Sequence, residues 1–104
     1  MANIDFAKVQ TTEARKARKQ KDRRLALKAE ARHRIEAVFD DRTQMNLVGA
    51  AIAGDLSRAE IVVFRASTRW IAETLAAMRV AASSGADPEW PAAPPGLREL
   101  AAKF

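Results

Sequence analysis

The sequence predicts an all-α protein: a long N-terminal helix and an antiparallel helical hairpin, preceded by an extended N-terminal peptide and followed by a Pro-rich C-terminal strap. Three observations favour this fold class. Residues 13–39 contain no Gly or Pro and consist mainly of strong helix formers. Ser57 and Glu60 form a capping box before a second long helical pattern. All four prolines lie within residues 88–95, where they prevent the helix from resuming.

Composition limits the function classes. At 104 residues, with 48% hydrophobic and 30% charged residues, the chain is long enough for one small domain. Residues 13–34 hold ten Lys or Arg and three acids, which is a net charge of +7. Because the whole chain has a net charge of +5, the remaining residues have a net charge of −2. Cysteine is absent, and no apolar run approaches the roughly 18 residues of a membrane span or the pattern of a signal peptide. We expect a soluble protein with a basic arm, a mildly acidic body and no membrane partner.

Residues 1–11 are predicted to be an N-terminal docking peptide. Ile4, Phe6 and Val9 make this segment too apolar for a solvated tail without contacts, yet it is too short to fold alone. The Thr-Thr-Glu sequence that follows supplies a helix N-cap and an acid for the first turn. We therefore expect the first helix to begin near residue 12 and the three apolar side chains to dock on a partner.

The first helix is expected to cover about residues 12–53, with a kink or break near residue 40. Only its second half carries an apolar stripe, which begins at Ile35 and continues through Met45 and Ile52. Before Ile35 the same steps meet charged residues, so the first half has no core of its own to serve. Gly54 gives a stop signal, because glycine adopts the left-handed C-cap conformation at little cost.

The second helix is expected at residues 58–83 and should pair with the first as an antiparallel hairpin. Apolar residues recur along it in alternating steps of three and four, which is a heptad pattern. The predicted helix-bundle seam consists of Ile61, Phe64, Ile71, Leu75 and Met78. Such a coiled-coil seam can be filled by the chain itself or by neighbouring copies in a symmetric bundle, and we expect a homo-oligomer.

Residues 84–104 are predicted to form a Pro-rich strap with a short terminal helix. Trp90 is the one large anchor of the strap, and it can pack back onto the hairpin or dock on another protein. Leu97 and Phe104 fall on one side of the terminal helical turns. We assign Trp90, Leu97 and Phe104, together with the N-terminal apolar residues, to partner docking.

Catalytic and metal chemistry finds little support. His33 is the only histidine, and Glu30 precedes it at the Glu-x-x-His spacing of helical di-iron sites. Such a site needs a second copy of the motif, and Arg32 and Arg34 beside His33 repel a cation. No Gly-x-Ser-x-Gly elbow or phosphate-binding glycine loop is present. We expect no enzyme activity, no catalytic or metal residues and no cofactor.

The basic helix allows a nucleic-acid hypothesis. Its positive residues are spread around the helix, and no aromatic residue among them offers a platform for base stacking. No apolar face accompanies them between residues 13 and 24, which disfavours a membrane-surface helix. A charged helix that is solvated or buried in an assembly is preferred, and nucleic-acid binding is the alternative.

Three stretches, "IDFAKVQTTEARKAR", "RIEAVFDDRTQMNLVGAAIAGDLS" and "EWPAAPPGLRELAAKF", resemble in order the small accessory proteins encoded beside tail and tail-fibre genes of tailed bacteriophages, prophages and gene transfer agents of alphaproteobacteria. The resemblance implies a non-enzymatic structural component of a phage-like virion, in the tail, fibre-attachment or spike region. It would be assembled in the bacterial cytoplasm, form an oligomeric helical bundle and dock on other virion proteins. A tail-fibre assembly chaperone is a further alternative, although the larger domain of those proteins is missing.

Overall fold

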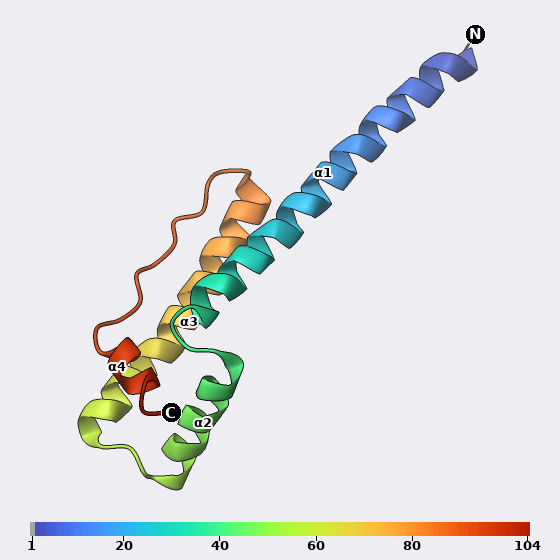
Figure 1. Ribbon diagram of the computed structural model, residues 1–104. Coiled ribbons are helices and arrows are strands. Elements are labelled where there is room, and N and C mark those ends of the chain that lie inside the picture. Colours follow the sequence, from blue (N-terminus) through green and yellow to red (C-terminus); the bar gives the residue numbers. More distant parts are fainter. Residues whose placement is uncertain (1) are drawn as a thin grey trace.

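A computed structural model describes residues 2–104, and the side chains of residues 11–104. Its regular secondary structure over the described residues is entirely helical, so the predicted all-α fold is confirmed. The helices are α1 (Ala2–Glu36), α2 (Asp41–Ala53), α3 (Arg58–Ser84) and α4 (Leu97–Ala101). Figure 1 shows α1 and α3 side by side in opposite directions, with α2 forming the corner between them. A strap from the end of α3 brings α4 back to this corner.

The extended N-terminal peptide is a wrong prediction, because α1 is already helical from Ala2. Residues 2–12 contain no Gly or Pro, so nothing in them stops a helix that has nucleated further along the chain. The side chains of Ile4, Phe6 and Val9 lie outside the described side chains. A continuous helix of 35 residues replaces the predicted peptide and its junction near residue 12.

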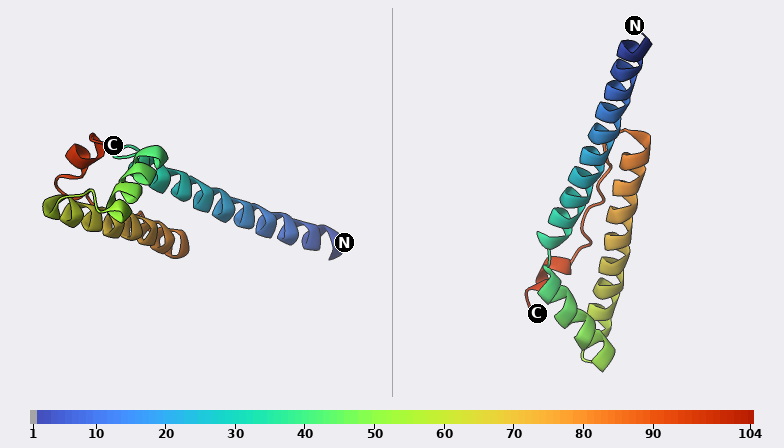
Figure 2. Two further views of the ribbon diagram at one scale, coloured as in Figure 1. Left: turned by 90° about the horizontal axis from the view of Figure 1, so that it is seen from below. Right: turned by 90° about the vertical axis from the view of Figure 1, so that its right-hand side faces the viewer.

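Only the second half of α1 packs against the rest of the chain. Leu27, Ala31 and Ile35 are buried at steps of four and face α3. Every side chain from residue 11 to residue 22 is exposed. Figure 2 shows this first half projecting alone past the end of α3, which makes the molecule 73 Å long and only 22 Å by 18 Å across.

A true break separates α1 from α2 at residues 37–40. The Asp40 carboxylate accepts a hydrogen bond from the Thr43 backbone N–H at 2.8 Å and caps the new helix. That hydrogen bond lowers the pKa of Asp40. Phe39 is buried at the turn, where its ring stacks on Trp70 with 6.4 Å between centroids. Because α2 turns away here, α1 rather than α2 runs along α3 as the antiparallel partner.

The corner between α2 and α3 follows the local signals closely. Gly54 takes the left-handed conformation, with φ of 78°, and ends α2. The Ser57 hydroxyl accepts from the Glu60 backbone N–H at 3.1 Å, and the Glu60 carboxylate accepts from the Ser57 N–H at 2.9 Å, which confirms the capping box. This backbone hydrogen bond, followed by the one from Lys103, lowers the pKa of Glu60.

The buried line of α3 differs from the predicted seam. Its most buried residues are Ser67, Trp70, Thr74, Met78 and Ala81. The two hydroxyl residues can lie in the centre because their oxygens donate to carbonyls of their own helix, at 2.6 Å and 2.8 Å, so no buried polar group lacks a partner there.

Of the predicted seam, Met78 alone is buried, whereas Ile61, Phe64, Ile71 and Leu75 are half-buried on one flank of α3. Two residues of the stripe expected in the first helix, Met45 and Ile52 of α2, are 75% and 82% exposed, so they do not belong to the chain's own core.

Candidate functional site

Three of the predicted docking residues lie in the strap and the terminal helix, and the structure uses them differently. Leu97 is fully buried in the core beside Trp70, so it cannot dock a partner as predicted. Trp90 is half-buried against the Leu27 end of the helix pair, with the Arg34 guanidinium 4.9 Å from its ring centroid. Phe104 remains 36% exposed. The strap residues therefore serve mainly the chain's own packing.

The strap closes one of the two grooves between α1 and α3. The Trp70 indole N–H donates to the Pro91 carbonyl at 3.0 Å, and Trp90 packs on the cluster of Leu27, Ala31, Met78 and Ala81. Figure 2 shows the strap running along the pair of helices from one end to the other. This contact covers one flank of α3 and leaves the opposite flank, which carries the predicted seam, without a cover from the strap.

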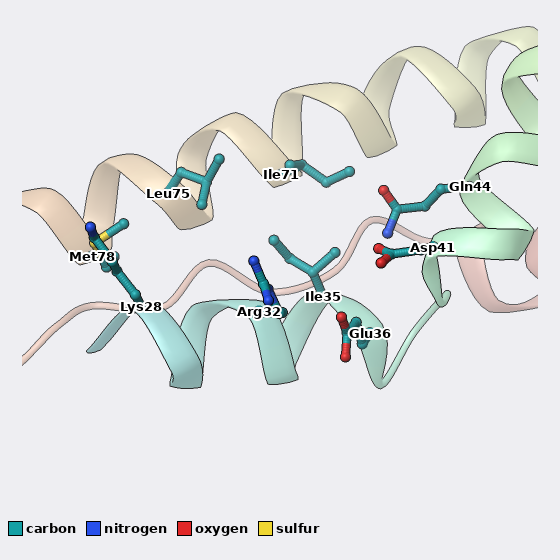
Figure 3. Close-up of a pocket in the computed structure, with 9 residues that line it drawn as sticks. All are labelled: Lys28, Arg32, Ile35, Glu36, Asp41, Gln44, Ile71, Leu75 and Met78. Carbon is teal, nitrogen blue, oxygen red and sulfur yellow. The ribbon is translucent and has the colours of Figure 1, made fainter. Parts of the chain in front are cut away.

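The open groove lies on that opposite flank and is the first candidate site. Ile35, Ile71, Leu75 and Met78 form its apolar floor, in a cavity of about 320 Å³. Figure 3 shows Ile35 of α1 and Ile71 of α3 pointing into the same space, while the strap passes behind them. Asp41 and Gln44 of α2 close one end. Three of the predicted seam residues are thus brought together, but at a surface rather than in a core.

The walls of the groove are basic. Arg24, Lys28 and Arg32 follow one another at steps of four along α1, and Arg79 stands across from them on α3. None of these four side chains forms an ion pair or a hydrogen bond with a described residue. The described ion pairs join Arg34 to Glu30 and Lys103 to Glu60. The open groove, defined as this apolar floor with its basic walls, holds these four cations and, at the end beside α2, the two acids Glu36 and Asp41, so its net charge is +2.

The basic arm, residues 2–22, is the second candidate site and is the part of α1 that precedes the contacts with α3. It holds six Lys or Arg and three Asp or Glu, which is a net charge of +3, whereas residues 23–104 hold twelve Lys or Arg and ten Asp or Glu, which is +2. More than half of the net charge of +5 therefore lies on the part of α1 that projects. Charges at this spacing on an exposed helix repel one another and attract an anionic surface.

Arg23 follows the arm directly and has a different role. Its Nη2 donates to the carbonyl oxygens of Ala86 at 2.7 Å and Ala81 at 3.4 Å, where α3 ends at Gly85. A cation at a helix C-terminus also interacts favourably with the helix dipole. Arg23 thus fastens the two helices together. Sequence reasoning missed this role, since nothing local distinguishes Arg23 from its neighbours.

The side chains of residues 11–104 include no group of three or more His, Cys, Asp or Glu that could hold a metal ion. His33 is exposed on α1, and the nearby Glu30 is engaged by Arg34 at 3.1 Å. Within the same part of the chain, each helix is too short or too polar to cross a bilayer.

Comparisons with models of protein families, with curated proteins and with solved structures found no match to this chain.

Proposed function

We propose that the chain is a non-enzymatic structural component of a phage-like particle, in which the folded end and the projecting basic arm bind different neighbours. One observation carries this proposal: the 21 residues of the projecting arm hold a net charge of +3, whereas the 82 residues that follow hold only +2. This division suits a protein whose basic arm binds an acidic surface while its folded part binds a different neighbour.

The energetics of the arm support a partner. An isolated charged helix is only marginally stable in water, because its helical hydrogen bonds barely offset the entropy of ordering the chain. Residues 2–22, which precede Arg23, extend over about 32 Å at a rise of 1.5 Å per residue. An acidic neighbour would compensate their repulsion and stabilise the helix. The resemblance to accessory proteins of phage tail modules supports a place in the tail, fibre-attachment or spike region, with other virion proteins as neighbours.

Quantitative mass spectrometry of purified particles tests this function. A structural component should be present in fixed stoichiometry, whereas a soluble assembly chaperone should be absent. Neutralising the arm should reduce incorporation by tenfold or more, through the substitutions Arg15→Gln, Lys16→Gln, Arg18→Gln and Lys19→Gln. The matched control removes four exposed cations from the folded part, through Arg42→Gln, Arg58→Gln, Arg65→Gln and Arg69→Gln. Absence from wild-type particles, or equal loss in both variants, would refute the proposal.

Nucleic-acid binding is the second candidate, and the same concentration of charge favours it. Each phosphate contact releases a counterion, so the logarithm of the affinity falls with the logarithm of the salt concentration with a slope of roughly −0.9 per contact. If the arm binds DNA, the variant with four glutamines in the arm should lose up to about four phosphate contacts and show a correspondingly shallower slope. The control variant should keep the wild-type slope. A wild-type protein that fails to bind DNA at low salt removes this candidate.

A further inference from the structure

We propose that the open groove between α1 and α3 binds an acidic amphipathic helix of a partner protein. This surface is distinct from the basic arm, and the inference does not depend on the function proposed for the arm. It rests on three features of the groove: an apolar floor, a row of three unpaired cations on the α1 wall with Arg79 across from them on α3, and a length that matches a short helix.

The shape of the groove fits a helix. Two antiparallel helices in contact leave a groove on each side, and a third helix packs into such a groove in helical bundles. In this chain the strap fills one groove with Trp90, and none of the residues that line the other groove comes from the strap. From Arg24 to Glu36 the open groove extends over 12 helical steps, or about 18 Å, which accommodates about three turns of a guest helix.

The charge of the groove selects an acidic guest. Lys28 and Arg32 are one helical turn apart on the α1 wall, so acids spaced by one turn on the guest can meet both. Arg24 and Arg79 flank the far end. Apolar residues on the facing stripe of the guest would cover the floor, and burial of apolar area contributes about 25 cal/mol per Å². The basic arm of a second copy would be repelled by the same walls.

The ends of the groove also set the direction of the guest. Glu36 and Asp41 lie at the end closed by α2, while Arg24 and Arg79 lie at the open end. The N-terminus of a helix carries positive partial charge and its C-terminus carries negative partial charge. The guest helix should therefore place its N-terminus beside α2 and run antiparallel to α1.

A pair of synthetic peptides tests this proposal on the full-length protein. Each peptide has about 14 residues, with leucines on one helical stripe; one carries glutamates beside the stripe and the other carries lysines at the same positions. Binding is measured by fluorescence anisotropy, and its place by NMR shifts of the methyl groups of Ile71 and Leu75. We expect the acidic peptide to bind at least tenfold more tightly than the basic one and to shift both methyl groups.

Charge reversal supplies the decisive comparison. The double substitution Lys28→Glu and Arg32→Glu should lower the affinity for the acidic peptide at least tenfold and raise the affinity for the basic peptide. The matched control, Arg15→Glu with Lys19→Glu, reverses an Arg and a Lys at the same spacing on the arm and should change neither. All four side chains are exposed, so thermal melts should remain close to wild type. Absence of binding at millimolar peptide, equal affinity for both peptides, equal loss in the control, or groove shifts caused by self-association would overturn the proposal.

Discussion

Replacing Arg23 by Met should loosen the end of the helix pair. The substitution keeps most of the apolar stem and removes the donors to Ala81 and Ala86, at 3.4 Å and 2.7 Å. Hydrogen bonds from a charged group contribute about 1.5–3 kcal/mol, and a cation at a helix C-terminus adds about 0.3–1 kcal/mol. The Arg23 Nε is buried without a hydrogen-bond partner, which offsets part of this gain. We expect a net loss of about 1–2 kcal/mol.

The assay is thermal unfolding followed by circular dichroism, with Arg24→Met as the matched control. For a domain of this size a loss of about 1–2 kcal/mol lowers Tm by roughly 5–10 °C. Arg24 is exposed and makes no described hydrogen bond, so its replacement should change Tm by no more than about 2 °C. If both variants melt together, or if Arg23→Met melts like wild type, Arg23 does not fasten α1 to α3.

Three further outcomes follow from local geometry. Gly54→Ala should destabilise the protein by about 1 kcal/mol in urea titrations, because φ at Gly54 is 78°. Gly49→Ala, in the open interior of α2, should stabilise the protein by about 0.5–1 kcal/mol. If Gly54→Ala is the more stable of the two variants, Gly54 does not cap α2. Leu97→Ala should cost about 2–5 kcal/mol through a buried cavity, whereas Leu25→Ala, at a site 54% exposed, should change stability by less than about 0.5 kcal/mol. The pKa of Glu60 is lowered from 4.5, so its carboxylate stabilises the fold above that pH and loses this contribution as the pH falls through the folded-state pKa. Glu60→Gln should therefore have a lower Tm than wild type at pH 7, and the two Tm values should converge in acid. A difference in Tm between the two proteins that does not change with pH would contradict this assignment.

The features that the sequence predicted correctly depend on local chemistry. Ser57 and Glu60 lie three residues apart, and their capping box needs nothing from the rest of the chain. Gly54 ends α2 because glycine readily adopts the left-handed conformation that this C-cap requires. The helical class, the corner and the end of α3 all follow from such signals.

The features that could not be predicted depend on residues far apart in the sequence. Arg23 differs from the other cations of α1 only because it meets the carbonyl of Ala86, 63 residues away. Ser67 and Thr74 lie in the centre of the packed face, although a hydrophobic pattern assigns that place to Ile71 and Leu75. The open groove likewise exists because the strap covers one flank of α3 and not the other, which no periodicity in α3 can reveal.

The place of α4 in the core affects how the chain can fold during its synthesis. Leu97, Leu100 and Ala101 are three of the eight buried residues of the larger cluster, and they pack beside Trp70. A nascent chain that has reached only the end of α3 must therefore leave this apolar surface open to water. The cluster closes only after residue 101 has left the ribosome, and until then the emerging helices are exposed to aggregation and to chaperones.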